Sequence, residues 1–362
     1  MKHWQEMGDI VDRVLRFGNG GATTALAIVT RIEGSAYRRP GAKLLIDDKG
    51  GVLGGVSGGC LEEDVRLVGL KVLESGRTRT LHYDTGGDDS KLWGLGLGCE
   101  GRVDILVSPI RPDSASDTWA PIRRELQGDG PFALATIVED QGAGGVLVVG
   151  RSGCIAGSVG DRSVDKEVER VASAALDAGQ TRLSTLGSRQ IFTEVLLPPP
   201  KLLVCGAGDD ARPLVEFAAA VGFRVFVADH RPAHLTRERF PAAQKLLQLR
   251  PDESSPDLPT DGTTFVVVKT HSLKHDTAWV KRLSGTNVPY IGVLGPRARI
   301  GKILDGSAVE NKKRIFGPVG IDIGADGPEQ VALSIVAEAL AIWSSRTPRH
   351  LREVQGALHA SA

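Results

Sequence analysis

Residues 201–229 constrain the fold of this chain more than any other stretch; they read KLLVCGAGDDARPLVEFAAAVGFRVFVAD. An apolar run ends at Cys205, a Gly206-Ala-Gly208 turn follows, an amphipathic pattern comes next, and a second apolar run ends at Asp229. A Gly-x-Gly-x-x-Ala turn between a strand and a helix, with an acidic residue about 20 positions further on, is typical of dinucleotide-binding folds. The stretch therefore predicts a doubly wound, Rossmann-like α/β domain.

The rest of the carboxy-terminal part agrees with this fold. Apolar runs predict further strands, and a closing amphipathic helix is expected; their ranges are 245–249, 264–268, 288–293 and, for the helix, 328–344. Upstream, three consecutive prolines at 198–200 cannot continue a strand ladder or a helix, so they mark a connector. Because 362 residues exceed the roughly 250–300 that one core serves, we expect two domains, 1–197 and 198–362.

The amino-terminal part contains an internal repeat. Each copy reads as strand, hairpin, helix and strand, and the copies span about 22–85 and 131–197. Gly51-Val-Leu-Gly-Gly in the first copy aligns with Gly153-Cys-Ile-Ala-Gly in the second. The predicted fold class is thus α/β, with a duplicated α+β domain followed by the Rossmann-like domain.

Composition limits the possible partners and the compartment. Lys+Arg and Asp+Glu number 44 each, so no net charge draws the chain to nucleic acid or to an anionic membrane. No apolar run reaches the roughly 18 residues of a membrane span, and residues 1–18 read as an amphipathic helix rather than a secretory signal. Four cysteines do not make a disulfide framework in a chain of this size. We expect a cytoplasmic protein with neither a nucleic-acid nor a membrane partner.

One candidate site lies in the first copy, where residues absent from the second copy gather. Ser57-Gly58-Gly59-Cys60 precedes a predicted helix, and the N–H groups of a helix start favour anions. Ser35, Arg38 and Arg39 lie in a glycine- and proline-bounded turn, and guanidinium groups bind phosphate or carboxylate. The same helix start favours a thiolate at Cys60, which could be a nucleophile, a sulfur carrier or a soft metal ligand.

Three other cysteines have simpler interpretations. Cys99 lies in a second glycine-rich loop, where it could join the ligand site or simply be a small buried residue. Cys154 and Cys205 fall inside apolar runs, and we expect both to be buried. A reversible disulfide between Cys60 and Cys99, in a redox-sensing protein, is a third and weaker alternative.

A second candidate site follows the strands of the Rossmann-like domain. Gly206, Gly208 and Asp229 stand where a dinucleotide would bind, although the charges of Asp209 and Asp210 oppose a pyrophosphate there. Thr270 and His271 follow another strand and are candidates for capping or ligand contact. His271 and His275 have the spacing of a helical metal pair, but no further ligand set accompanies them, so no metal site is predicted.

These motifs resemble the xanthine dehydrogenase accessory family, also called XdhC/CoxI, over residues 10–345. The resemblance rests on GSAYRRPGAKLLI, GGVSGGCLEEDV, GLGLGCEGRVDILV, the run 197–229, Thr270-His271, YIGVLG and GIDIGADGPEQVALSIVAEAL. It implies a maturation factor that binds the molybdenum cofactor (molybdopterin) as cargo, shields its sulfurated form, and passes it to a xanthine dehydrogenase or carbon monoxide dehydrogenase type enzyme.

Partners and alternatives follow from the same resemblance. It implies a molybdoenzyme client, and a cysteine desulfurase and a homodimer are compatible with it. Cys60 is the residue we place nearest to the chemistry. The alternative function is an NAD(P)-dependent oxidoreductase that uses the Rossmann-like domain. We expect that domain to bind NAD, NADP or a related nucleotide weakly, with a preference for NAD because of Asp229.

Overall fold

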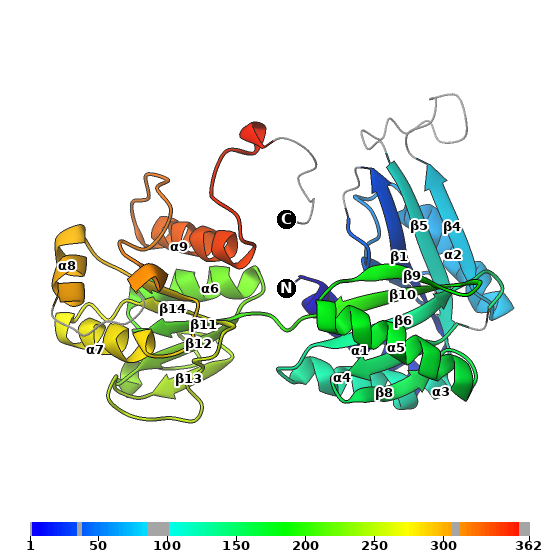
Figure 1. Cartoon of the computed structure of the whole chain (residues 1–362), viewed down its shortest axis with the longest axis horizontal. Coiled ribbons are helices and arrows are strands. Elements are labelled where there is room, and N and C mark those ends of the chain that lie inside the picture. Colours follow the sequence, from blue (N-terminus) through cyan, green and yellow to red (C-terminus); the bar gives the residue numbers. More distant parts are fainter. Residues whose placement is uncertain (1, 35–37, 85–100, 143, 306–311, 355–362) are drawn as a thin grey trace. The chain divides into compact units, whose positions relative to one another are not determined.

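The computed structural model of the chain describes residues 2–34, 38–84, 101–142, 144–305 and 312–354. Residues 2–198 form one unit and the chain from Pro199 onward forms another, and we call them the amino-terminal and carboxy-terminal units. The predicted fold class is confirmed: antiparallel sheets with helices make up the first unit, and a parallel sheet between helices makes up the second (Figure 1). Within the described ranges, no helix is both long and apolar enough to cross a bilayer.

The amino-terminal unit consists of two halves with the same topology. Its sheets have the strand orders β3-β2-β1-β5-β4 and β8-β7-β6-β10-β9, so each strand of the first half has a counterpart five numbers later. The elements of the first half are α1 (Lys2–Asn19), β1 (Thr24–Gly34), β2 (Lys43–Ile46), β3 (Val52–Gly54), α2 (Glu62–Ser75), β4 (Arg79–Asp84) and β5 (Gly101–Ile110). Those of the second are α3 (Pro112–Ser114), a π-helical turn η1 (Ala115–Trp119), α4 (Ala120–Gln127), β6 (Phe132–Val138), β7 (Val146–Gly150), β8 (Gly153–Ser158), α5 (Arg162–Ala178), β9 (Arg182–Leu186) and β10 (Arg189–Leu196).

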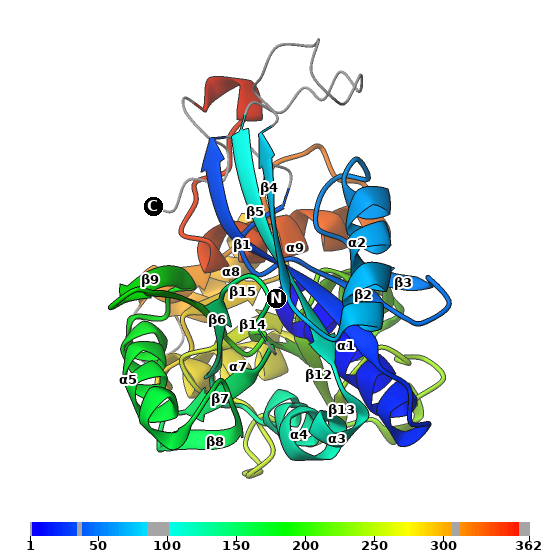
Figure 2. The ribbon, with the colours of Figure 1, turned by 90° about the vertical axis from the view of Figure 1, so that its right-hand side faces the viewer.

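The duplication is complete in the structure, whereas the first repeat predicted from the sequence, about 22–85, ends before β5. Strand β5 pairs with β1 from Thr24 to Gly34 and is the counterpart of β10. Helix α2 covers one face of the first sheet and α5 covers the matching face of the second (Figure 2). Val65 and Val168, which the sequence alignment sets one residue out of register, are both fully buried under these helices.

A core between the inner faces of the two sheets joins the halves. Helix α1 contributes its apolar face to this core, as predicted for an amphipathic helix, and the π-helical turn contributes Trp119. The core residues come from both halves; they include Met7, Ile10, Leu26, Ile28, Phe132, Leu134, Val148 and Phe192. The two halves therefore share one interior and do not fold as separate lobes.

The carboxy-terminal unit is a six-stranded parallel sheet of order β13-β12-β11-β14-β15-β16. Helices α6 and α9 pack on one face and α7 and α8 on the other (Figure 1). The strands are β11 (Lys201–Cys205), β12 (Arg224–Asp229), β13 (Lys245–Gln248), β14 (Thr264–Val268), β15 (Tyr290–Val293) and β16 (Ile315–Phe316). The helices are α6 (Arg212–Ala220), α7 (Leu273–Ser284), α8 (Arg297–Asp305) and α9 (Pro328–Trp343), with short 3-10 turns at Asp209–Ala211, Pro232–His234, Lys312–Arg314 and Leu351–Glu353. The strand order reverses direction between β11 and β14, and the crevice of such a fold lies there.

Candidate functional site

The hairpin β2–β3 brings the two predicted motifs of the first half to the same end of the sheet. Strand β2 begins at Lys43, directly after the turn that carries Arg38 and Arg39. Strand β3 runs antiparallel to β2 and ends at Gly54, whose partner is Leu44, and Gly55 N–H donates to the Lys43 carbonyl at 2.7 Å. The end of the arginine turn and the start of the loop Ser57–Cys60 therefore lie beside each other in space, although the hairpin separates them in the sequence.

Ser57 organises the start of α2. Its hydroxyl accepts hydrogen bonds from the N–H groups of Gly59 and Leu61, both at 3.1 Å, and donates to Glu62. The thiol of Cys60 lies 3.4 Å from the same oxygen. Cys60 is half-buried against the core of the first half. Ser57 and Cys60 are thus in contact, and Gly58 and Gly59 are exposed beside them.

Acidic residues surround this helix start, which weakens the predicted anion site. Glu62, Glu63 and Asp64 occupy the first turn of α2. Burial raises the pKa of Glu62, but hydrogen bonds from the Ser57 hydroxyl and backbone lower it more, so the carboxylate is charged. Since carboxylates already offset the positive end of the helix, an anionic ligand at Cys60 would depend on cations from elsewhere.

The arginine turn supplies such cations, and Arg38 is already paired with a carboxylate. Arg38 Nη2 donates to both carboxylate oxygens of Glu6 on α1, at 2.9 and 2.8 Å. Arg39 is exposed. A ligand phosphate could recruit Arg38 only by competing with Glu6. Ser35 and Cys99 lie outside the described residues.

A buried ion pair, which the sequence did not suggest, anchors this turn to the second half. Lys43 Nζ lies 2.5 Å from Glu194 Oε1 and donates to the Gly41 carbonyl at 2.8 Å. The two side chains are 4% and 3% exposed, and His3 Nδ1 lies 3.6 Å from Glu194. Burial raises the pKa of Glu194, but the Lys43 charge lowers it below its usual range.

In the carboxy-terminal unit, Gly206 lets the turn after β11 pass close to the end of β14. Its φ is +120°, and a Cβ there would lie 2.5 Å from the Lys269 carbonyl oxygen. Its N–H continues the sheet by donating to the Ala228 carbonyl at 2.8 Å. Gly208 follows in an extended conformation before the 3-10 turn that precedes α6. The strand–turn–helix geometry of the dinucleotide fingerprint is therefore present.

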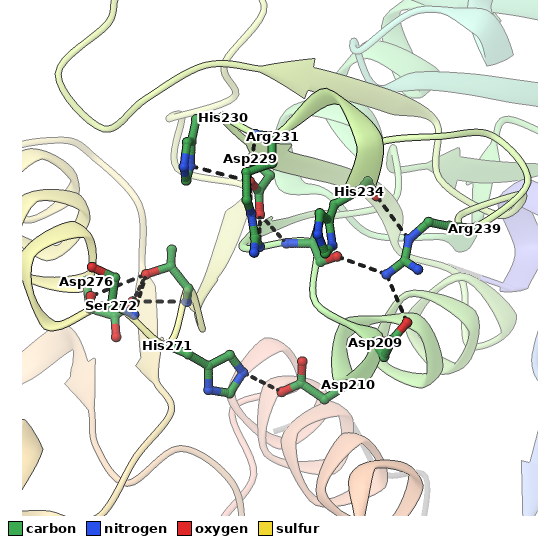
Figure 3. A network of polar contacts seen from close by, with 12 residues as sticks. Asp209, Asp210, Asp229, His230, Arg231, His234, Arg239, His271, Ser272 and Asp276 are labelled. Atoms are coloured by element: carbon green, nitrogen blue, oxygen red, sulfur yellow. Dashed lines mark hydrogen bonds and ion pairs between the residues drawn. The ribbon is translucent and has the colours of Figure 1, made fainter.

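Asp229, the residue that would accept a hydrogen bond from a ribose hydroxyl in this fingerprint, already has hydrogen-bond partners in the protein. Asp229 accepts from Ala207 N–H at 2.8 Å and from the Arg231 guanidinium at 3.0 and 2.9 Å (Figure 3). Burial raises the pKa of Asp229, but the hydrogen bonds from Arg231 and Ala207 lower it to about 2. Asp229 therefore holds the glycine turn in place, and Arg231 covers both of its oxygens.

The two aspartates that oppose an anion are each paired with cations. Asp209 lies 3.0 Å from Arg239, and Asp210 lies 2.9 Å from His271 (Figure 3). Asp210 also lies 3.1 Å from Lys269. Burial lowers the pKa of Lys269, although the charge of Asp210 opposes that shift. Because these pairs neutralise the acidic charge locally, the repulsion expected from the sequence is smaller in the fold.

Thr270 is held by hydrogen bonds to a buried carboxylate, and His271 beside it has an unusual backbone conformation. Asp276 on α7 is 1% exposed, and its Oδ1 accepts from the Thr270 N–H at 3.0 Å and from the Thr270 hydroxyl at 2.6 Å. Arg299 balances its charge at 2.6 Å. His271 has a φ of +61°, which is rare for a residue other than glycine and which turns its ring toward Asp210.

His271 and His275, which have the spacing of a helical metal pair, contact different partners. His275 lies in α7 and stacks edge-on against His230, with ring centroids 4.8 Å apart, while His271 contacts Asp210. Within the described ranges, no group of three His, Cys, Asp or Glu side chains could hold a metal. Cys205 is buried as predicted, but the prediction for Cys154 is wrong, because it lies on the edge strand β8 and is exposed.

Comparison with known proteins places both units in one family. A model of the XdhC and CoxI family matches residues 19–84 and 126–187, and a model of the XdhC Rossmann domain matches residues 202–339. A Bacillus subtilis (strain 168) protein, named as a probable xanthine dehydrogenase subunit, is 32% identical over 322 residues, which cover 87% of this chain and 92% of that protein. The chain belongs to the XdhC/CoxI family.

Two further relatives of this XdhC/CoxI member cover nearly its whole length. The molybdenum cofactor insertion chaperone PaoD of Escherichia coli (strain K12) is 24% identical over 355 residues, 94% of this chain and 93% of PaoD. A crystal structure from Bacillus halodurans, described as a xanthine dehydrogenase, superposes with a TM-score of 0.77 and 26% identity. It covers 95% of this chain and 98% of its own. The resemblance identified from the motifs is thereby confirmed.

Proposed function

We propose that this protein binds the molybdenum cofactor as cargo and inserts it into an enzyme of the xanthine dehydrogenase type. The observation that carries the proposal is the alignment with PaoD, a molybdenum cofactor insertion chaperone, which runs through both units and spans 94% of this chain. The name of the Bacillus subtilis relative, which refers to xanthine dehydrogenase, supports the choice of client.

The site in the first half has chemistry that suits this cargo. Molybdopterin carries a phosphate and a metal bound through sulfur. Arg38 and Arg39 offer guanidinium groups to the phosphate, and Cys60 offers a soft sulfur at the end of the same hairpin. We propose that Ser35, Ser57, Gly58 and Gly59 line this site, with Cys60 nearest to the molybdenum–sulfur centre.

The finer steps are also part of the proposal. We propose that the cofactor is held in its sulfurated form and is protected until the client accepts it. A cysteine desulfurase is the partner that would supply the sulfur, and a homodimer would present two cargo sites to a client. We propose that Cys99 also contacts the cargo, and that Thr270 and His271 contact a nucleotide or related ligand of the Rossmann-like domain.

The decisive experiment identifies the ligand that the protein retains through purification. The full chain is purified from a host that makes the cofactor, and the ligand released by denaturation is analysed for molybdenum and for pterin fluorescence. We expect molybdenum and pterin in equal amounts, and faster activation of a cofactor-free client when the loaded protein is added. Protein that carries neither, and that leaves client activation unchanged, would exclude this function.

The alternative of an NAD(P)-dependent oxidoreductase has weaker support. The Gly206–Gly208 turn favours a dinucleotide, but Arg231 occupies both oxygens of Asp229. A ribose hydroxyl would have to displace that guanidinium. The same purified protein discriminates between the two functions, because an oxidoreductase would retain or turn over a nicotinamide cofactor.

A further inference from the structure

Because the amino-terminal unit is duplicated, the sheets of its two halves meet at two equivalent places, which we call junctions. One lies at Lys43 and Glu194, and the other at their counterparts. Gly54 pairs with Leu44 on β2, and Gly157 pairs with Leu147 on β7. Both glycines have positive φ, +94° and +79°. This register makes Lys43 the counterpart of Val146. In the same way Glu194, which pairs with Leu134 on β6, is the counterpart of Ser108, which pairs with Leu26 on β1.

The two junctions differ because of these two substitutions. At one junction the Lys43–Glu194 ion pair fills the space between the sheets, and a void of only about 20 Å³ remains beside it. At the other, Ser108 and Val146 are too short to meet, and a cavity of about 470 Å³ is present. That volume is in the range of small-molecule sites, roughly 300–1,000 Å³.

The walls of this cavity combine apolar side chains with the hydroxyl group of Thr118. Leu26, Ile28 and Val146 form part of an apolar wall. Thr118 is 8% exposed and lines the cavity, yet its hydroxyl makes no hydrogen bond to any described residue. It lies in the π-helical turn η1, and such turns occur frequently at functional sites. The hydroxyl of this buried residue is therefore open to the cavity, where a ligand or water would supply its partner.

Charged groups at the cavity define what the ligand could be. Arg111, Asp113 and Asp117 all line it, and none of the three forms an ion pair with another described residue. Each aspartate uses one oxygen locally, Asp113 for Ser114 N–H and Asp117 for Ser116, and thus keeps one oxygen free of these contacts. Carboxylates bind best to groups with two parallel N–H donors.

We propose that this cavity binds a flat nitrogen heterocycle with an amidine edge, the chemistry shared by guanine and pterin rings. The apolar wall would contact the ring faces, Asp113 or Asp117 would accept from the adjacent N–H and NH₂ groups, and Arg111 would meet a ring carbonyl oxygen. The site differs from the arginine and cysteine site of the first half. It does not require the cofactor function, because a free heterocycle without phosphate or metal suffices.

Calorimetric titration of the full chain with guanosine and with 6-hydroxymethylpterin tests the proposal and separates the two sources. We expect saturable binding of at least one of them. Inosine lacks the 2-amino group and should bind at least tenfold more weakly than guanosine if the nucleobase is the ligand. Absence of saturable binding of both compounds up to about 1 mM, a free energy of roughly −4 kcal/mol, would overturn the proposal.

Variants place any binding in this cavity. The double variant Ser108→Glu with Val146→Lys rebuilds the ion pair of the other junction and should abolish binding. If that protein does not fold, Asp113→Asn and Asp117→Asn change only exposed carboxylates. At least one of these should raise the Kd tenfold or more, whereas Asp48→Asn, an exposed carboxylate in the β2–β3 turn, should not. Affinity that is unchanged in both aspartate variants would show that the compounds bind elsewhere.

Discussion

At the scale of single residues, the surroundings of each cysteine separate one candidate from two others. Cys60 is half-buried beside the Ser57 hydroxyl at the start of α2. Cys205 is fully buried, and burial raises its pKa well above the usual value. Cys154 is exposed, but partial burial and the nearby carboxylates Glu169 and Asp165 raise its pKa as well. Of these three thiols, Cys60 is the one best placed to contact a ligand.

We therefore predict that Cys60→Ser folds normally but retains less than a tenth of the molybdenum of the wild-type protein. Serine preserves the size of the side chain and removes the soft sulfur ligand. Cys154→Ser is the matched control, because it makes the same change on an edge strand and should retain the metal fully. Metal content is measured on protein purified in parallel. A Cys60→Ser protein with wild-type loading would remove this residue from the site.

Asp229 gives a prediction about pH. Its pKa of about 2 lies below the ordinary 3.8, so the folded state favours the charged form. The corresponding stabilisation, about 2 kcal/mol, is fully present above pH 4 and is lost as the pH falls toward 2. Asp229→Asn should be less stable at pH 7 and should lose less stability between pH 4 and 2. Urea unfolding at several pH values measures this, with the exposed Asp252→Asn as control.

At the scale of elements, local patterns in the sequence predicted most helices and strands. The helix expected at 328–344 corresponds to Pro328–Trp343, and the helix predicted to follow Ser57–Cys60 is Glu62–Ser75. Strand β5 was not assigned to the first repeat, because its pairing with β1 is a contact between distant segments that periodicity does not reveal. Element identity is encoded locally, whereas the membership of a strand in a sheet is not.

The junction between the halves shows the same limit for side chains. Lys43 and Glu194 are 151 positions apart, and nothing near either residue in the sequence indicates that both will be buried. The arginine turn was recognised from its composition, but its anchoring to Glu6 and Glu194 required the fold. Similarly, Asp229 was identified by its spacing from the glycines, while the cover that Arg231 provides became visible only in the structure.

We predict that Glu194→Gln destabilises the protein by about 3–5 kcal/mol, because it leaves the Lys43 charge buried without its partner. The double variant Lys43→Met with Glu194→Leu removes both charges and should recover most of that loss. Glu63→Gln is the control, since its pair with Arg66 is exposed and its loss should leave the stability nearly unchanged. Urea unfolding provides the comparison. Equal stability of Glu194→Gln and wild type would mean that the pair is solvated.

At the scale of the whole molecule, the family relationship covers both units, so neither is an accessory attachment to the other. The alignments with PaoD and with the Bacillus halodurans structure span 94% and 95% of the chain. The sequence predicted the Rossmann-like domain because its fingerprint is local. The charges around its glycine turn are less local. Arg239 and Lys269 pair with Asp209 and Asp210 from segments that lie far along the chain, whereas Arg231 pairs with its near neighbour Asp229.

Our last prediction concerns nucleotide binding. We expect the full chain to bind NAD with a Kd no tighter than micromolar, a free energy of about −8 kcal/mol or weaker. The physical reason is that a ribose hydroxyl must displace Arg231 from Asp229, whose carboxylate also holds the Ala207 N–H. Arg231→Ala should therefore strengthen NAD binding several-fold, because it uncovers the carboxylate. Arg250→Ala, at an exposed position, should have no effect.

Calorimetric titration of the wild type and both variants with NAD and NADP measures these affinities and tests the role of Arg231. A gain for NAD in Arg231→Ala, with little or no gain for NADP, would show that Asp229 can receive a 2′-hydroxyl once it is free. Weaker binding of both dinucleotides in Arg231→Ala would instead make this arginine a ligand contact. Tight stoichiometric NAD binding by the wild type, together with hydride transfer to a substrate, would favour the oxidoreductase over the insertion chaperone.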